Sequence, residues 1–211
     1  MGRYTGPVCK LCRREGQKLF LKGTKCYTEK CPVERRSYPP GQHGVAQTRR
    51  RKMSDYALQL REKQKVKRMY GVGEQYFRNL FRAASQHGGM TGENLLVSLE
   101  SRLDNIVYRL GFAGSRAQAR QLVRHRHVEV NGRPVDIPSY QVQPGDEVRL
   151  KEKSRDLLPV QVSLESKTRP DTVSWLALDE GTRAGRMLER PSRDEIPLPV
   201  QEQLIVELYS K

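Results

Sequence analysis

The chain has 211 residues and a net charge of +15, from 39 Lys and Arg against 24 Asp and Glu. Only 36% of the residues are hydrophobic, and no run approaches the roughly 18 apolar residues of a membrane-spanning helix. Residues 1–52 contain 14 basic and 3 acidic residues, a net charge of +11. This concentration indicates a surface that binds phosphates, because solubility alone would not require it.

All the cysteines lie near the start of the chain, in two pairs. Cys9 and Cys12 form a C-x2-C pair, and Cys26 and Cys31 form a looser one. This spacing is typical of a structural zinc site with four thiolate ligands and no open position for a substrate. An iron–sulfur cluster uses the same ligands and stays open as an alternative. Disulfides are less favoured, since no apolar secretory signal is seen at the start, and a redox pair would need a βαβ pattern, which is absent.

A strap and two helices are expected next. Residues 38–44 include two prolines and two glycines, which predict an extended segment, and a cationic run follows at 49–52. Ser54 is suited to cap a helix that ends near Met69. A second helix is predicted over 74–86, where apolar side chains recur on one face. The two helices should form one small layer.

The middle of the chain carries the strongest patterns. Apolar residues recur every three or four positions over 93–110, which predicts one long helix. Ser115 should cap another helix over 116–124. Alternation at 128–130 runs into Asn131-Gly132, the usual signal of a β-hairpin. A further strand is expected at 147–150, after a Pro-Gly-Asp turn.

The last part of the chain gives weaker signals. Short strands are expected at 173–178 and 186–188, followed by a proline-rich link over 191–199. No motif is recognisable over 156–171. The apolar segment near the end is expected to pack back on the helices of residues 56–81, which would hide Leu204 and Val206.

Three arginines on one predicted helix suggest a phosphate-binding face. Arg116, Arg120 and Arg124 follow one another at four-residue steps and so share a side. No acid occurs between Asp104 and Glu129, whereas a solvated helix face usually mixes both signs. Each guanidinium is therefore expected to meet a backbone phosphate, with Ser115 at the helix N-terminus nearby.

Several segments together closely resemble a known family. RLDNIVYRLGF at 102–112, SRAQARQLV at 115–123 and the turns at 130–132 and 144–146 are similar to the small RNA-binding domain of the small-subunit ribosomal protein four family. The cysteine segment, YPPGQHG at 38–44 and QLIVELYS at 203–210 also resemble the bacterial form of that family, in its metal-binding, four-cysteine branch. The resemblance covers nearly the full length.

Patterns and resemblance together predict an α+β fold in three parts. The first is an N-terminal four-cysteine metal knuckle with an extended strap, at 1–45. The second is a small helical domain at 46–92, completed by 187–211. The third is an inserted RNA-binding domain at 93–186, with a helix pair packed on a small antiparallel sheet.

The resemblance implies a structural constituent of the small (30S) ribosomal subunit in the cytoplasm, with no enzymatic activity, small-molecule substrate or membrane. It implies a primary binder of the 5′ domain of 16S rRNA that nucleates assembly of the subunit body and contributes to translational accuracy. Ribosomal protein five, other small-subunit proteins and mRNA near the channel where the messenger enters are the further partners implied. Binding would depend on phosphates and A-form shape.

Two other functions are weighed against this one. An RNA-modifying enzyme can carry the same small domain, but the chain shows no catalytic signature. A zinc-dependent nucleic-acid-binding regulator is the other alternative.

The expected site residues follow from these arguments, and none is catalytic. The expected metal ligands are Cys9, Cys12, Cys26 and Cys31, with Zn²⁺ as the ion. The expected RNA-binding residues are Arg3, Lys10, Arg13, Arg14, Lys22, Arg35, Arg36, His43, Arg49, Arg50, Arg51, Lys52, Arg61, Lys65, Arg68, Ser115, Arg116, Gln118, Arg120, Arg124, His127, Asn131 and Arg133.

Overall fold

The computed structural model describes residues 4–46, 53–166, 173–179 and 181–210. The chain forms two compact units: one runs up to Gly92 and resumes at Pro199, and the other comprises Glu93–Leu198. The cysteine segment and the helices after it, expected as separate parts, belong to one unit. Residues 187–198, expected in the helical part, belong to the other unit. They are tied there by backbone hydrogen bonds, for example from Leu188 N–H to the Trp175 carbonyl at 2.9 Å.

The first unit is helical in the part the structure describes. Its elements are α1 (Cys9–Glu15), η1 (Gly23–Tyr27), α2 (Pro32–Arg35), α3 (Asp55–Met69), α4 (Glu74–Gln86) and α9 (Glu202–Tyr209). The predictions for α3 and α4 are confirmed. Ser54 is the N-cap of α3, and its Oγ accepts a hydrogen bond from Ala57 N–H at 3.3 Å.

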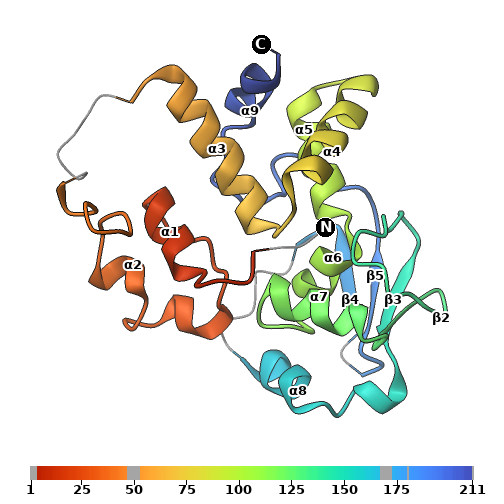
Figure 1. Ribbon diagram of the computed structural model, residues 1–211. Helices are drawn as coiled ribbons and strands as arrows, with labels where there is room; N and C mark the ends of the chain where they lie inside the picture. The colour runs from red at the N-terminus through yellow and green to blue at the C-terminus, as the bar shows by residue number, and fades with distance from the viewer. Residues whose placement is uncertain (1–3, 47–52, 167–172, 180, 211) are drawn as a thin grey trace. The chain divides into compact units, whose positions relative to one another are not determined.

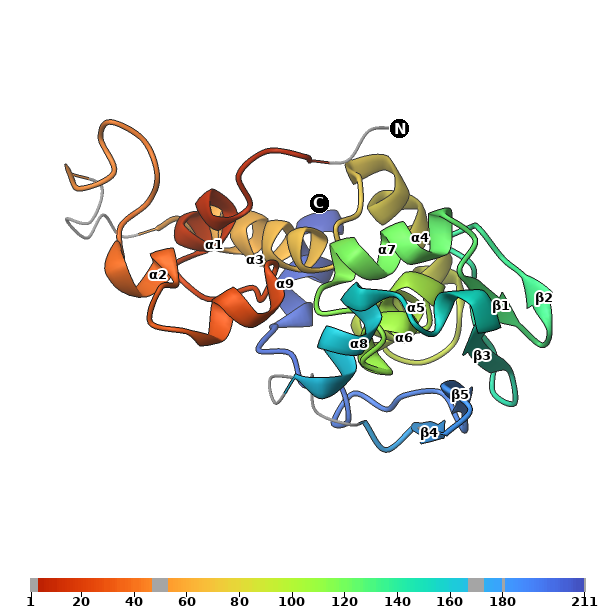
Figure 2. The ribbon, with the colours of Figure 1, turned by 90° about the horizontal axis from the view of Figure 1, so that it is seen from below.

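Helix α9 lies beside α3, as Figures 1 and 2 both show. The return of the chain end onto the earlier helices is thus confirmed, but the buried residue differs from the expected ones. Ile205 is buried, whereas Leu204 and Val206 are only half-buried. Because the segment is a helix, residues four apart share a face. Tyr209, four after Ile205, accordingly stacks on Phe81 with 4.6 Å between ring centroids.

Helix α3 buries polar side chains, among them Lys65, which was expected to bind RNA. Lys63 donates to Glu74 Oε1 at 2.7 Å, and Lys65 donates to the Pro199 carbonyl at 2.9 Å. Gln59 donates to Glu207 Oε2 at 2.9 Å. Burial of such groups is tolerated because each hydrogen bond replaces one lost to water. These bonds attach α4 and α9 to α3.

The second unit has helices packed on a five-stranded antiparallel sheet. Its helical elements are α5 (Thr91–Glu100), α6 (Leu103–Arg109), α7 (Arg116–Arg124), η3 (Glu152–Ser154) and α8 (Leu158–Glu165). The strands, in the order β2-β1-β3-β5-β4, are β1 (Val128–Val130), β2 (Arg133–Pro134), β3 (Glu147–Leu150), β4 (Leu176–Asp179) and β5 (Ala184–Met187). Figures 1 and 2 show α6 and α7 side by side. The mixed α+β class and the predicted helix pair on a small sheet are confirmed.

The predicted hairpin is confirmed in detail. Asn131 and Gly132 both adopt positive φ, 49° and 76°, as the two-residue turn between β1 and β2 requires. Val128 pairs with Leu150 and Val130 pairs with Val148 across β1 and β3. All these side chains are buried in the core beneath the helices, together with the fully buried Trp175.

The single long helix predicted over 93–110 is wrong. It divides into α5 and α6 because the backbone of residues 101–103 turns aside to pair with another segment. Arg102 is extended, with φ −69° and ψ 139°, and bridges to Gln141. Leu103 N–H donates to the Tyr140 carbonyl at 2.9 Å. A long-range pairing of this kind leaves no trace in the apolar period of the helix itself.

The late strands begin at other residues than expected, at Leu176 and Ala184, and α8 was not predicted. Ser163 Oγ on α8 donates to the Gly111 carbonyl at 2.8 Å, and Val160 is fully buried. On β5, a Cβ at Gly185 would overlap the side chain of Leu110, so that only glycine lets the strand pass over this residue.

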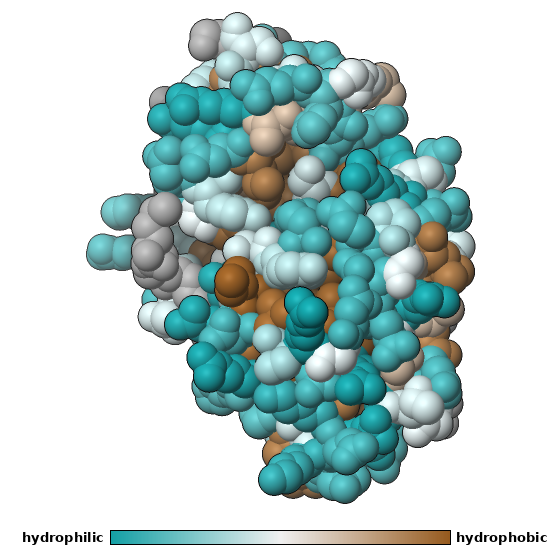
Figure 3. Space-filling model, turned by 90° about the vertical axis from the view of Figure 1, so that its right-hand side faces the viewer, coloured by the Kyte–Doolittle hydropathy of each residue, from teal (hydrophilic) through white to brown (hydrophobic). Residues whose placement is uncertain are grey.

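Hydrophilic residues cover most of the face of the molecule seen in Figure 3, with hydrophobic residues showing between them. Among the described helices, none combines the length and the apolar character needed to cross a membrane.

Candidate nucleic-acid interface

The four cysteines are free thiols gathered in the first unit. Cys12, Cys26 and Cys31 are buried, and Cys9 is partly exposed. Burial raises the pKa of Cys12 to about 11; the Leu19 backbone amide partly offsets this, and the other three cysteines raise it further. Such mutual influence requires the four sulfurs to be near one another.

The expected metal knuckle does not take the form of a coordination site. Within the described residues, no group of three or more His, Cys, Asp or Glu side chains is arranged to hold a metal ion. Helix α1 carries Cys9 and Cys12, η1 carries Cys26, and Cys31 is the N-cap of α2. The donor set itself, four sulfurs with no disulfide between them, is chemically suited to zinc.

The expected RNA-binding residues of the first unit fall into two groups, of which the first is exposed. Its members are Lys10, Arg14, Lys22, Arg35, Arg36 and His43. Arg3, Arg49, Arg50, Arg51 and Lys52 lie outside the described residues. Lys25 and Lys30, absent from the expected set, are also exposed, and only the local density of basic residues signalled them.

The second group is turned inward and holds the unit together. Arg61 and Arg68 of α3 both pair with Glu15 of α1, whose side chain is 2% exposed. Burial raises the pKa of Glu15, and the arginines oppose this rise. Lys65 is bound to Pro199, as described above. Arg13 supports the strap, with Nε 3.0 Å from the Tyr38 carbonyl. Arg61 and Arg68 thus attach α1 to α3, Lys65 attaches the chain end to α3, and Arg13 attaches the strap to α1.

The predicted arginine face of α7 is wrong as an exposed stripe. Arg116 donates through Nε to Asn105 Oδ1 at 2.8 Å, and its Nη2 lies 3.7 Å from Glu100 Oε1. Arg120 donates to Asp104 Oδ2 at 3.2 Å. Only Arg124, of these three, is exposed.

The partners of these arginines are buried carboxylates from preceding elements. Glu100 is fully buried and accepts two bonds from Arg109, at 3.0 and 2.8 Å, and one from Asn105 Nδ2 at 2.7 Å. Asp104 accepts two from Arg102, at 3.0 and 2.7 Å. Buried charges must be paired in this way. Arg116 and Arg120 therefore dock α7 onto α6.

The remaining expected residues near α7 also have internal partners. Ser115 Oγ accepts from Gln118 N–H at 3.3 Å, and Gln118 Nε2 donates to the Pro159 carbonyl at 3.3 Å. His127 Nδ1 lies 2.9 Å from Ser154 Oγ, and burial, followed by the charges of His125 and Lys151, lowers its pKa. Asn131 donates to Asp146 Oδ1 at 2.7 Å. Arg133 is exposed.

The basic side chains that remain exposed on the two units are available to bind phosphates. On the first unit they lie in the cysteine segment and its surroundings; on the second they lie at the end of α7 with the hairpin, at Arg124 and Arg133. No catalytic constellation is visible among the described residues.

Comparisons with known proteins cover the full chain. Residues 3–100 match the family model of the ribosomal protein S4/S9 N-terminal domain, and residues 101–148 match that of the S4 domain. Over 211 residues, the chain is 59% identical to small ribosomal subunit protein uS4 of a Thermus thermophilus strain and 58% identical to that of Geotalea uraniireducens. It is 59% identical to the protein of the same name from Dictyoglomus turgidum. Each alignment spans all of both chains.

Proposed function

The chain belongs to the family of bacterial small ribosomal subunit protein uS4, and on this premise we propose that it is a structural constituent of the small ribosomal subunit. The observation that carries this proposal is the match over the whole length, with both family models in order. The match leaves no part of the chain for a separate catalytic domain, so the protein is a structural RNA binder and not an enzyme. Its location is the 30S subunit in the cytoplasm.

The proposed RNA is 16S rRNA, bound chiefly through its phosphates. The exposed Lys10, Lys25 and Lys30 of the cysteine segment and the exposed Arg133 near the α7 end support this, because exposed cations are available to neutralise phosphates. The proposal includes early binding to the 5′ domain, nucleation of the subunit body, and contacts with ribosomal protein five and with mRNA near the channel where it enters. A contribution to translational accuracy would follow from those contacts.

A footprint on naked 16S rRNA tests this function. We expect protection concentrated in the 5′ domain. With about six to eight phosphates neutralised, the slope of log K against log salt should be roughly −5 to −7, using the duplex value per contact. Protection scattered over the RNA, or a nearly flat salt titration, would contradict the proposal.

We also propose that the four cysteines hold one zinc ion. Support comes from four free sulfurs close enough to influence one another's pKa and from their chemistry as a donor set. Metal analysis of the purified chain should find one zinc ion. Cys31→Ser should lose it and raise hydrogen exchange in α1 and α2, because metal binding and folding of such segments are coupled. Thr24→Ser in the same segment is the control. Visible absorption typical of iron–sulfur would instead favour the cluster.

A further inference from the structure

A hollow of about 330 Å³ lies in the cysteine segment, and its lining is strongly basic. Six of its eight lining residues are Lys or Arg, contributed by α1, η1, the Lys30 turn, α2 and Arg36 directly after it. None of the described residues that line it is acidic. Its size falls within the range of ligand pockets in proteins, so it has room for more than a bare ion.

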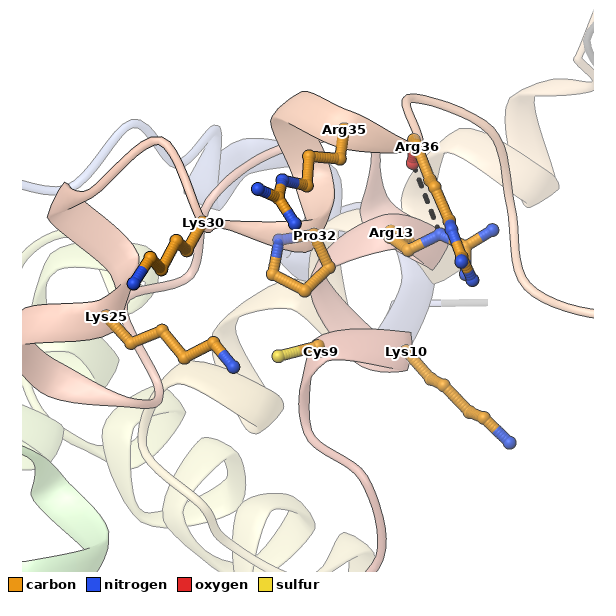
Figure 4. Close-up of a pocket in the computed structure, with 8 residues that line it drawn as sticks. All are labelled: Cys9, Lys10, Arg13, Lys25, Lys30, Pro32, Arg35 and Arg36. Atoms are coloured by element: carbon orange, nitrogen blue, oxygen red, sulfur yellow. Dashed lines mark hydrogen bonds between the residues drawn. The ribbon is translucent and has the colours of Figure 1, made fainter.

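The basic residues that line the hollow come from different segments. Figure 4 shows the Lys25 side chain extended toward the Cys9 sulfur and the Arg35 guanidinium over Pro32, whereas Lys10 points away. Lys25, Lys30 and Arg35 form no ion pair with any acid in the described part of the chain. Like charges held around one hollow repel one another, and an anion placed among them would relieve this repulsion.

One wall of the hollow is fixed by its own hydrogen bonds. Arg13 donates through Nε to the carbonyls of Arg36 and Tyr38, at 3.2 and 3.0 Å, and through Nη2 to that of Pro39 at 3.3 Å. Its guanidinium also lies over the Tyr38 ring, 4.7 Å from the centroid. A wall held in this way pre-organises the site, which lowers the entropy lost when a ligand binds.

We propose that this hollow is the seat of one backbone phosphate of the bound RNA, contacted jointly by Lys25, Lys30 and Arg35. The inference rests on the proposed RNA-binding function and deepens it. The competing explanation is that the cations only neutralise a metal–thiolate centre at the cysteines. Four thiolates around one divalent ion carry about −2, and the six lining cations exceed this charge.

The test compares salt dependence in two charge-matched variants of the full chain. The first combines Lys25→Gln, Lys30→Gln and Arg35→Gln. The control combines Arg78→Gln, Arg82→Gln and Lys153→Gln, which removes the same charge from exposed positions elsewhere. Each is titrated with 16S rRNA at about 0.05 and about 0.2 M salt. Hydrogen exchange in α1 and α3 checks that the first unit stays folded, and metal content is measured on the same samples.

The proposal predicts loss of one phosphate contact, since the three cations share one phosphate. The ratio of wild-type to variant affinity should then shrink about 3.5-fold between the two salt concentrations, at a slope of about 0.9 per contact. For the control variant, the ratio of wild-type to variant affinity should be the same at both salt concentrations. In addition, inorganic pyrophosphate should weaken RNA binding by the wild type more than by the pocket variant.

Other outcomes would overturn the proposal in distinguishable ways. Shrinkage of about 40-fold would mean three separate phosphate contacts and no shared seat. An unchanged ratio with loss of metal would assign the cations to the cysteine centre. Pyrophosphate binding at the hollow with an unchanged ratio would make it a site for a free phosphate. If the wild type itself shows no salt-dependent binding, the proposed function fails and not merely the seat.

Discussion

Replacing Arg116 by alanine should destabilise the second unit, although the residue lies on a helix whose arginines looked exposed in the sequence. The variant loses the ion pair between Arg116 Nη2 and Glu100 at 3.7 Å, together with two contacts whose contributions can be estimated. The hydrogen bond from Nε to Asn105 Oδ1, at 2.8 Å, involves a charged donor and contributes about 1.5–3 kcal/mol. The guanidinium lies 4.6 Å from the centroid of the Tyr108 ring, which adds about 0.5–1 kcal/mol.

Glu100 keeps its two bonds to Arg109 in this variant, so no buried carboxylate is left without a cation. We therefore expect a loss of about 2–3 kcal/mol in the free energy of unfolding, below the cost of breaking the whole buried network. Arg124→Ala is the matched control on the same helix. Because Arg124 is exposed, it should cost no more than about 0.5 kcal/mol.

Urea unfolding followed by tryptophan fluorescence is the assay. Trp175 is the single tryptophan and is fully buried in the second unit, so its emission reports that unit alone. With a slope of about 2 kcal/mol per M, the midpoint for Arg116→Ala should fall by about 1 M. Coincident midpoints for Arg116→Ala and Arg124→Ala, with RNA binding lost only in the former, would show that Arg116 serves the RNA surface and would refute this reading of the contacts.

Three further changes probe the first unit. Burial favours a higher pKa for Glu74, but its bonds to Lys63 and Lys67 outweigh this and lower the pKa from 4.5 to about 2. The stabilisation from these ion pairs is thus present above pH 4.5 and is lost as the pH falls from 4.5 to 2. The loss should be less than about 1 kcal/mol, because the carboxylate is partly exposed to solvent. Glu74→Gln should therefore flatten this part of a plot of unfolding free energy against pH. Glu15→Ala should speed amide exchange in α1, because Arg61 and Arg68 lose their shared partner, while Trp175 emission stays unchanged; equal exchange rates would show that the ion pairs do not dock α1. Deleting 200–211 should expose Met69 and Val66 of α3 and reduce exchange protection there, and full protection would mean that α9 is dispensable for this unit.

Features decided by neighbours in sequence could be predicted. Ser54 caps α3 through a bond to a residue three positions away, and the Asn131-Gly132 turn requires only two residues that accept positive φ. The apolar face of α4, which buries Phe77, Phe81 and Ala84, repeats within one helix. In each case the interaction that fixes the structure lies inside the window that a sequence pattern covers.

The arginines of α7 show why the candidate site was harder to predict. The absence of acids within the helix suggested an exposed face, but Glu100 and Asp104 reach it from elements that precede it in the chain. The same limit applies to the break at Arg102 and to α8, which depend on pairing with distant segments. Counting charges along a sequence finds the cations but cannot tell which of them pair with acids inside the folded protein.

The first unit is built from two separate parts of the chain, so its two parts are synthesised at different times. Helix α9, which covers α3, leaves the ribosome only after all of Glu93–Leu198 has been made. At about 5–20 residues per second this interval is roughly 5–20 s, far longer than the folding time of a small domain. Throughout this interval α3 lacks the cover of α9, whose Ile205 is buried once the first unit is complete. During that interval, the nascent chain presents the face of α3 that α9 later covers, and incompletely covered surfaces of nascent chains are what chaperones bind.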